Sequence, residues 1–183
     1  MNIVQIRVGK PQDISTESGL VRTALLKKEI SGPVAVTKKG LEGDGWGNPN
    51  VHGTPNQIIC AYPEKHYRYW RDYLSIKPFS FGSFGENIIL SNCDETTVRI
   101  GDICKVGDAL LEITSPRKPC STLNKVWESN SLMKHMAQTS KTGWFYKIVR
   151  EGSIEAGMKV ELISSDEGKP TVLESWLEQM KAK

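Results

Sequence analysis

Short segments that alternate apolar and polar residues recur along most of the chain, beginning with Ile3 to Val8. Each is brief and rich in β-branched or aromatic residues, which is typical of strands. Glycine and aspartate occupy the breaks between them, as expected for turns. The predicted strands span 3–8, 34–37, 57–61, 86–90, 98–100, 109–114, 144–150 and 159–163. This pattern favours a mainly β fold, a closed or nearly closed barrel of short strands with a few peripheral helices, over a doubly wound sheet.

A few segments carry a helical pattern instead. The first of them opens with Pro63 and an acidic residue, which suits a first helical turn. The predicted helices span 63–74, 121–129, 132–138 and 172–181. We expect a barrel domain over 1–165, followed over 166–183 by a polar linker and one short helix, because this tail is too short for a second domain.

Composition narrows the class of protein. The 183 residues include 24 basic and 21 acidic side chains, and the net charge of +3 is too small to argue for nucleic acid as a partner. The amino-terminal segment lacks the apolar core of a signal peptide, and no apolar run is long enough to span a membrane. These features predict a cytoplasmic protein without a membrane partner.

The cysteines are expected to be free thiols. Their spacings match no zinc-ligand pattern, and without a secretory signal a disulfide framework is not expected. The four positions are Cys60, Cys93, Cys104 and Cys120. Cys60 lies in an apolar run and is predicted to pack in the core.

Cys120 is the most informative of the four, because it ends the peptide Ser-Pro-Arg-Lys-Pro-Cys. The two prolines stiffen the loop, and Arg117 and Lys118 put positive charge beside the thiol. A helix starting at Ser121 would add the positive end of its dipole. Cations and a helix start both favour the thiolate, the form that attacks electrophiles and binds metals. The alternative is a buried structural cysteine in a turn.

Three other polar groups are weaker candidates when each is taken alone. The glycine-rich turn 82–87 lets a backbone approach a ligand closely, but such turns are common. Asp44 and His52 lie on a long loop, where His52 could simply cap a turn. Thr23 with Lys27 and Lys28 could hold a phosphate or form a solvated face.

Taken in order along the chain, these segments resemble a known family. They are Gly40–Asp44, His52–Gly53, Ala61–Tyr67, Phe84–Asn87, Ile100–Asp102, Pro116–Cys120 and Thr142–Trp144. Together they resemble the MOSC domain, found at the carboxyl termini of molybdenum cofactor sulfurases and in small stand-alone relatives. The Tyr-Pro-x-x-His-Tyr and Pro-Arg-x-Pro-Cys elements bring the chain closest to the YiiM-type branch.

The resemblance implies a β-barrel that binds the molybdenum cofactor (molybdopterin), a pyranopterin dithiolene with a terminal phosphate. Cys120 would be the catalytic residue and the protein ligand to molybdenum. The positions that match the cofactor-binding site are Thr23, Lys27, His52, Asn87, Arg117 and Cys120. Lys27 and Arg117 would neutralise phosphate or pterin oxygens, and Asn87 and His52 would hydrogen-bond the heterocycle or orient substrate.

The YiiM-type branch further implies an oxidoreductase that reduces N-hydroxylated bases and related hydroxylamines. Its electrons would come from a separate reductase, because the chain has no flavin, haem or iron–sulfur motif. The sequence does not decide whether the chain forms a homodimer. The alternatives are a sulfur carrier with a persulfide on Cys120, a non-catalytic carrier of the cofactor, and a barrel that has lost its cofactor.

Overall fold

The computed structural model describes residues 1–47, 54–74 and 80–182. The strands are β1 (Asn2–Val8), β2 (Gln12–Thr16), β3 (Gly19–Thr23), β4 (Lys28–Ile30), β5 (Val34–Thr37), β6 (Gly40–Leu41), β7 (Ile59–Pro63), β8 (Ile88–Ser91), β9 (Ile103–Val106), β10 (Ala109–Pro116), β11 (Trp144–Arg150), β12 (Gly152–Ile154) and β13 (Glu161–Ser164). The helices are α1 (His66–Leu74), α2 (Ser121–Val126), α3 (Leu132–Thr139) and α4 (Val172–Lys181). The prediction of a mainly β fold with few helices is confirmed.

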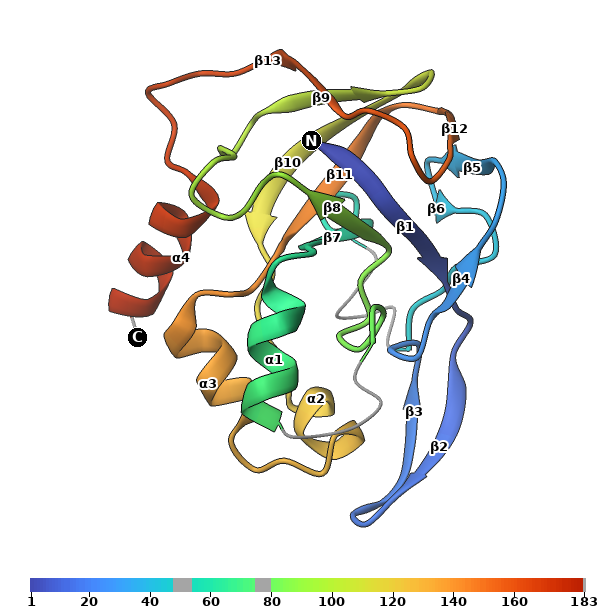
Figure 1. Ribbon diagram of the computed structural model, residues 1–183, viewed down its shortest axis with the longest axis vertical. Coiled ribbons are helices and arrows are strands. Elements are labelled where there is room, and N and C mark those ends of the chain that lie inside the picture. The colour runs from blue at the N-terminus through green and yellow to red at the C-terminus, as the bar shows by residue number, and fades with distance from the viewer. Residues whose placement is uncertain (48–53, 75–79, 183) are drawn as a thin grey trace.

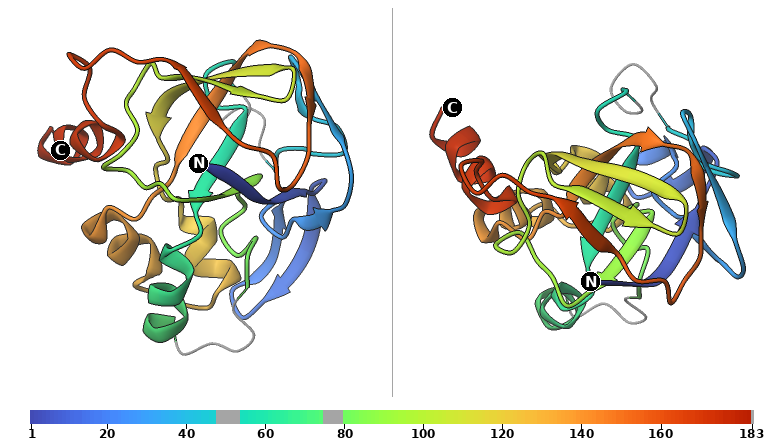
Figure 2. Two further views of the ribbon diagram at one scale, coloured as in Figure 1. Left: turned by 45° about the horizontal axis from the view of Figure 1, so that its top comes forward. Right: turned by 90° about the horizontal axis from the view of Figure 1, so that it is seen from above.

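Eight strands form one curled sheet in the order β13-β9-β10-β11-β7-β8-β1-β4. Every pairing in it is antiparallel except β7 with β8, which are parallel and are connected through α1. The sheet curls so far that the segment before β13 reaches the start of β1, where the Ile3 amide donates to the Met158 carbonyl at 2.9 Å. Seen from above, the strands enclose a half-barrel (Figure 2).

The inside of the half-barrel is apolar and buried, with side chains such as Ile6, Ile113 and Trp144 at its centre. A second buried cluster lies under the helices, around Trp70 and Phe84. Figure 1 shows α1, α2 and α3 gathered below one end of the sheet, with the β2–β3 hairpin beside them. The helices therefore cover one end of the half-barrel.

Three elements differ from the sequence-based prediction. The first helix begins at His66, because Ile59–Pro63 continues as a buried strand that pairs with β8. The predicted strand 98–100 is reduced to an isolated bridge between Arg99 and Thr171. The helix predicted over 121–129 ends at Val126, and Glu128 just beyond it has a positive φ of 48°.

Six short strands were not predicted. They are Gln12–Thr16, Gly19–Thr23, Lys28–Ile30, Gly40–Leu41, Ile103–Val106 and Gly152–Ile154. In the β2–β3 hairpin, exposed and half-buried positions predominate on both strands. Alternation of apolar residues cannot indicate such a strand.

The carboxyl-terminal helix α4 packs on the half-barrel. Thr171 and Glu174 form a capping box at its start, and the side chain of Trp176 is 2% exposed. The Trp176 indole donates to the Ala137 carbonyl at 2.9 Å, which ties α4 to α3. Within the described ranges, none of the helices has the length and apolar character needed to cross a membrane.

Candidate functional site

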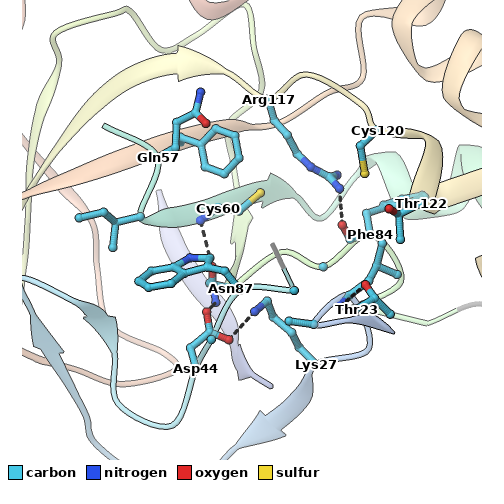
Figure 3. Close-up of a pocket in the computed structure, with 18 of the residues that line it drawn as sticks. Thr23, Lys27, Asp44, Gln57, Cys60, Phe84, Asn87, Arg117, Cys120 and Thr122 are labelled. Atoms are coloured by element: carbon cyan, nitrogen blue, oxygen red, sulfur yellow. Dashed lines mark hydrogen bonds and ion pairs between the residues drawn. The ribbon is translucent and has the colours of Figure 1, made fainter. Parts of the chain in front are cut away.

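A cavity lies where five segments, residues 22–27, 44–47, 57–60, 84–87 and 117–122, meet Phe145 of β11 (Figure 3). The centre of a water molecule can move through about 150 Å³ of it. That is about ten times the volume that a single water needs, so the cavity has room for a ligand of several groups. Trp46, Phe84 and Phe145 contribute aromatic surface to its lining.

Cys120 lies at the edge of this cavity and is half-buried. It is the N-cap residue of α2, with extended backbone angles (φ −113°, ψ 159°). It follows Pro116, the last residue of β10, after a loop of three residues. The chain therefore leaves the sheet, turns, and starts a helix with this thiol at the junction, as the sequence predicts.

Arg117 comes from the same loop but is buried, with 7% of its surface exposed. Its backbone amide donates to the Gly143 carbonyl at 3.0 Å, and its Nη2 donates to the Phe84 carbonyl. Its Nη1 has no hydrogen-bond partner among the described residues. A buried donor left in this state costs about 1–3 kcal/mol, so a ligand oxygen that accepts a hydrogen bond from the guanidinium would remove this cost. Figure 3 shows it extending across the cavity between Cys60 and Cys120.

The opposite wall is built on an ion pair between Lys27 and Asp44, whose side chains are 5% and 7% exposed. Asp44 also accepts from the Gly9 amide at 2.9 Å and from Asn87 Nδ2 at 2.7 Å. Asn87 in turn accepts from the Cys60 amide at 3.0 Å. The Asp44 carboxylate thus connects its own segment with the segments of Gly9, Lys27 and Asn87 along this wall.

The turn 82–87 owes its shape to a buried carboxylate. Glu86 accepts from the Gly82 amide at 2.7 Å and from the Phe84 amide at 2.9 Å. Burial raises the pKa of the Glu86 carboxyl, while these backbone bonds and the charge of Arg117 act in the opposite direction. Gly85 has a φ of 79° and lies close to Leu25, which lets the turn approach the wall of the cavity.

Cys60 is a buried residue, as the sequence predicts, and it also lines the cavity. It is only 5% exposed. Burial raises the pKa of the Cys60 thiol to about 11, with Arg117 acting in the opposite direction. A strand residue that faces a cavity and one that faces the core have the same apolar neighbours in sequence, so the pattern around Cys60 could not distinguish them.

The structure brings together five of the predicted site residues around one cavity. They are Thr23, Lys27, Asn87, Arg117 and Cys120. His52 lies outside the described residues. Thr23 is buried, and its hydroxyl oxygen accepts from the Leu25 amide at 3.1 Å. The aromatic residue Trp46 and the strand residue Phe145 were not predicted, because neither belongs to a recognisable polar pattern.

The charge around the cavity favours an anion. Among the described residues that line it, the cations are Arg22, Lys27, Arg117 and Lys118, against the single carboxylate of Asp44. A cavity walled by protein focuses such an excess of positive charge.

The cavity offers few metal ligands of its own. Over the described ranges, no three His, Cys, Asp or Glu side chains come together in a way that could hold an ion. A metal at Cys120 would therefore need to bring most of its ligands with it, and a thiolate suits a soft transition metal.

Fold and cavity together define a class: a half-barrel of short strands with a cationic pocket and a half-buried thiol at its edge. The chain belongs to the MOSC domain family, whose model matches residues 48–161. This family is associated with binding of the molybdenum cofactor.

Individual relatives agree with this assignment. YflK of Bacillus subtilis is 31% identical over 166 residues, which are 91% of this chain and 75% of YflK. The crystal structure of YiiM from Geobacillus stearothermophilus superposes with a TM-score of 0.79 at 34% identity, covering 98% of this chain and 83% of that one. A protein of Gibberella moniliformis named "Reductase" is 30% identical over 174 residues, which are 93% of this chain but only 31% of that protein.

Proposed function

We propose that this chain binds the molybdenum cofactor in the cationic pocket, with Cys120 as the protein ligand to molybdenum. The observation that carries the proposal is the pairing of a half-buried thiol with the buried Arg117, whose Nη1 has no partner among the described residues. A cofactor that supplies its own dithiolene sulfurs needs one thiolate from the protein and a cation for its phosphate.

The remaining cofactor-binding residues have chemistry that suits this role. Arg117 can bind phosphate or pterin oxygens through its guanidinium. Thr23 offers a hydroxyl in the same cavity, and Lys27 and Asn87 stand on the opposite wall. His52 stays in the proposed set on the family resemblance alone.

The proposed reaction is the reduction of N-hydroxylated bases and related hydroxylamines. Two electrons and two protons convert each R–NHOH to R–NH₂ and water, so the N–O bond breaks and nitrogen is reduced. The cofactor supplies two-electron chemistry when it is bound, and the protein supplies binding, orientation and electrostatics. A separate reductase delivers the electrons. The family membership and the relative named "Reductase" support an oxidoreductase.

Metal analysis tests the cofactor site. We expect about one molybdenum per chain in protein from a host that makes the cofactor, and loss of the metal in Cys120→Ala. Cys60→Ser is the matched control, because it alters the other thiol of the cavity and should retain the metal. Molybdenum that survives Cys120→Ala would contradict the assignment of this ligand.

The reaction is tested on the metal-loaded protein with a chemical reductant and an N-hydroxylated base, and product amine is measured. Metal-free protein carrying an extra sulfur on Cys120, detected by intact mass, would favour the sulfur carrier instead. Bound molybdenum without turnover of any hydroxylamine would favour the non-catalytic carrier.

A further inference from the structure

We propose that Asp44 is a positioning residue that determines which of the two buried cations of the pocket, Lys27 or Arg117, binds an anion. It compensates the charge of Lys27 and holds Asn87 in place, and it thereby leaves Arg117 as the buried cation that contacts the ligand. This inference concerns the pocket of the proposed function and refines the roles of two residues within it.

The contacts of Asp44 account for both of its oxygens. Oδ1 accepts from the Gly9 amide and from Lys27 Nζ, and Oδ2 accepts from Asn87 Nδ2 at 2.7 Å. Figure 3 shows the contacts with Lys27 and Asn87. Because the Lys27 and Asp44 side chains are both more than nine-tenths buried, each charge needs the other. Lys27 is therefore held as one half of a pair.

The side-chain amide of Asn87 likewise has protein partners for its nitrogen and its oxygen. Its Nδ2 donates to Asp44 and to the Arg7 carbonyl at 3.2 Å, which uses both amide hydrogens. Its Oδ1 accepts from the backbone amide of Cys60. Asn87 thus links Asp44 to strand β7 and fixes the wall on which Cys60 stands.

Arg117 differs from both. It is also more than nine-tenths buried, yet its Nη1 has no partner among the described residues, and the side chain extends into the cavity. A ligand oxygen that hydrogen-bonds to Nη1 removes the cost of this buried donor, whereas one that binds Lys27 must compete with Asp44. The geometry therefore favours Arg117 as the anion contact.

A double-mutant cycle separates direct contact from positioning. The probe is inorganic phosphate, titrated calorimetrically into the full chain prepared without cofactor, so the result does not depend on molybdenum content. We expect Lys27→Met to weaken phosphate binding about tenfold, because it leaves the Asp44 charge uncompensated beside the anion. Adding Asp44→Asn to it should restore the affinity to within about threefold of the unaltered chain. Arg117→Met should cost tenfold or more in either background.

A double variant as weak as Lys27→Met alone would overturn the proposal, because Lys27 would then contact the anion itself. Absence of phosphate binding to the unaltered chain would overturn it as well. If Lys27→Met fails to fold, Lys27→Gln takes its place, since its amide keeps one donor towards Asp44 without the charge.

Labelling of Cys60 tests the positioning of the wall independently. In Asp44→Asn one of the two carboxylate oxygens is replaced by an NH₂ group. In either orientation of the new amide, this NH₂ group faces a donor that hydrogen-bonds to the Asp44 carboxylate. The link through Asn87 to Cys60 is therefore weakened. We expect iodoacetamide to label Cys60 at least about fivefold faster, while the buried Cys93 and Cys104 stay protected as reporters of the intact fold.

Asp13→Asn is the matched control. Asp13 pairs with Arg22, another cation that lines the cavity, but this pair is exposed and should leave the labelling of Cys60 unchanged. Equal labelling of Cys60 in Asp44→Asn and the unaltered chain would contradict the positioning role.

Discussion

At the scale of single residues, the pocket sets two thiols in contrasting environments. Cys120 is half-buried at the start of a helix, whereas Cys60 is buried in a strand. The thiol of Cys120 is accessible to a ligand, whereas burial keeps the thiol of Cys60 neutral. Position in the fold therefore decides the chemistry of each thiol.

This contrast predicts a pH-dependent order of alkylation in the folded protein. Iodoacetamide should label Cys120 first near neutral pH, and labelling of Cys60 should rise steeply only as the pH approaches its raised pKa of about 11. Mass spectrometry of labelled peptides measures both, with the urea-unfolded chain as control. Labelling of Cys60 at pH 8 as fast as in the unfolded chain would contradict the buried environment.

The same pKa shift has a consequence for stability. The thiol of Cys60 has a higher pKa in the folded chain than its ordinary value of 9.0. Above pH 9 the thiol loses its proton more readily in the unfolded chain than in the folded one. The free energy of unfolding is therefore unaffected by the ionisation of this thiol below pH 9 and decreases as the pH rises from 9 towards 11.

At the scale of elements, the turn 82–87 shows how a loop becomes a wall of the site. Gly85 has a φ of 79°, and a Cβ added there would lie 3.2 Å from the Leu25 Cα. Both the backbone angle and the close approach require glycine. The carboxylate of Glu86 closes the turn from inside.

Gly85→Ala should therefore lower the free energy of unfolding in two ways. The positive φ costs about 1 kcal/mol, and displacement of the Leu25 backbone adds about as much again. Gly157→Ala is the matched control, because Gly157 has a φ of 89° but nothing within 4 Å of an added Cβ. Urea denaturation of both variants measures the difference, and equal losses would mean that the close approach to Leu25 has no cost.

At the scale of the whole molecule, the half-barrel assembles a pocket from residues as far apart in the chain as Arg22 and Phe145. The β2–β3 hairpin brings Thr23, the start of β7 brings Cys60, and the loop after β10 brings Cys120. The helices close one end of the sheet beside it (Figure 1). A rigid sheet with short connections holds such a constellation more precisely than loops alone would.

Much of this organisation could be predicted from the sequence. Strands with one buried face, such as Trp144–Arg150, are recognisable because alternation follows directly from the pleat. The helix over 172–181 is recognisable because its cap and its apolar stripe are local features. The hairpin strand Gly19–Thr23, exposed or half-buried along most of its length, has no such pattern and was missed.

The sequence by itself determined the mainly β class and the helix start after Cys120, because these depend on local spacing, and the order of its motifs predicted a set of polar residues for one site. Only the tertiary structure decided what those residues touch. It paired Lys27 with Asp44, bound both amide hydrogens of Asn87, turned Cys60 towards the cavity, and left one nitrogen of Arg117 without a partner among the described residues. The physical reason is that the pairing of buried polar groups depends on distances between segments that sequence spacing does not contain.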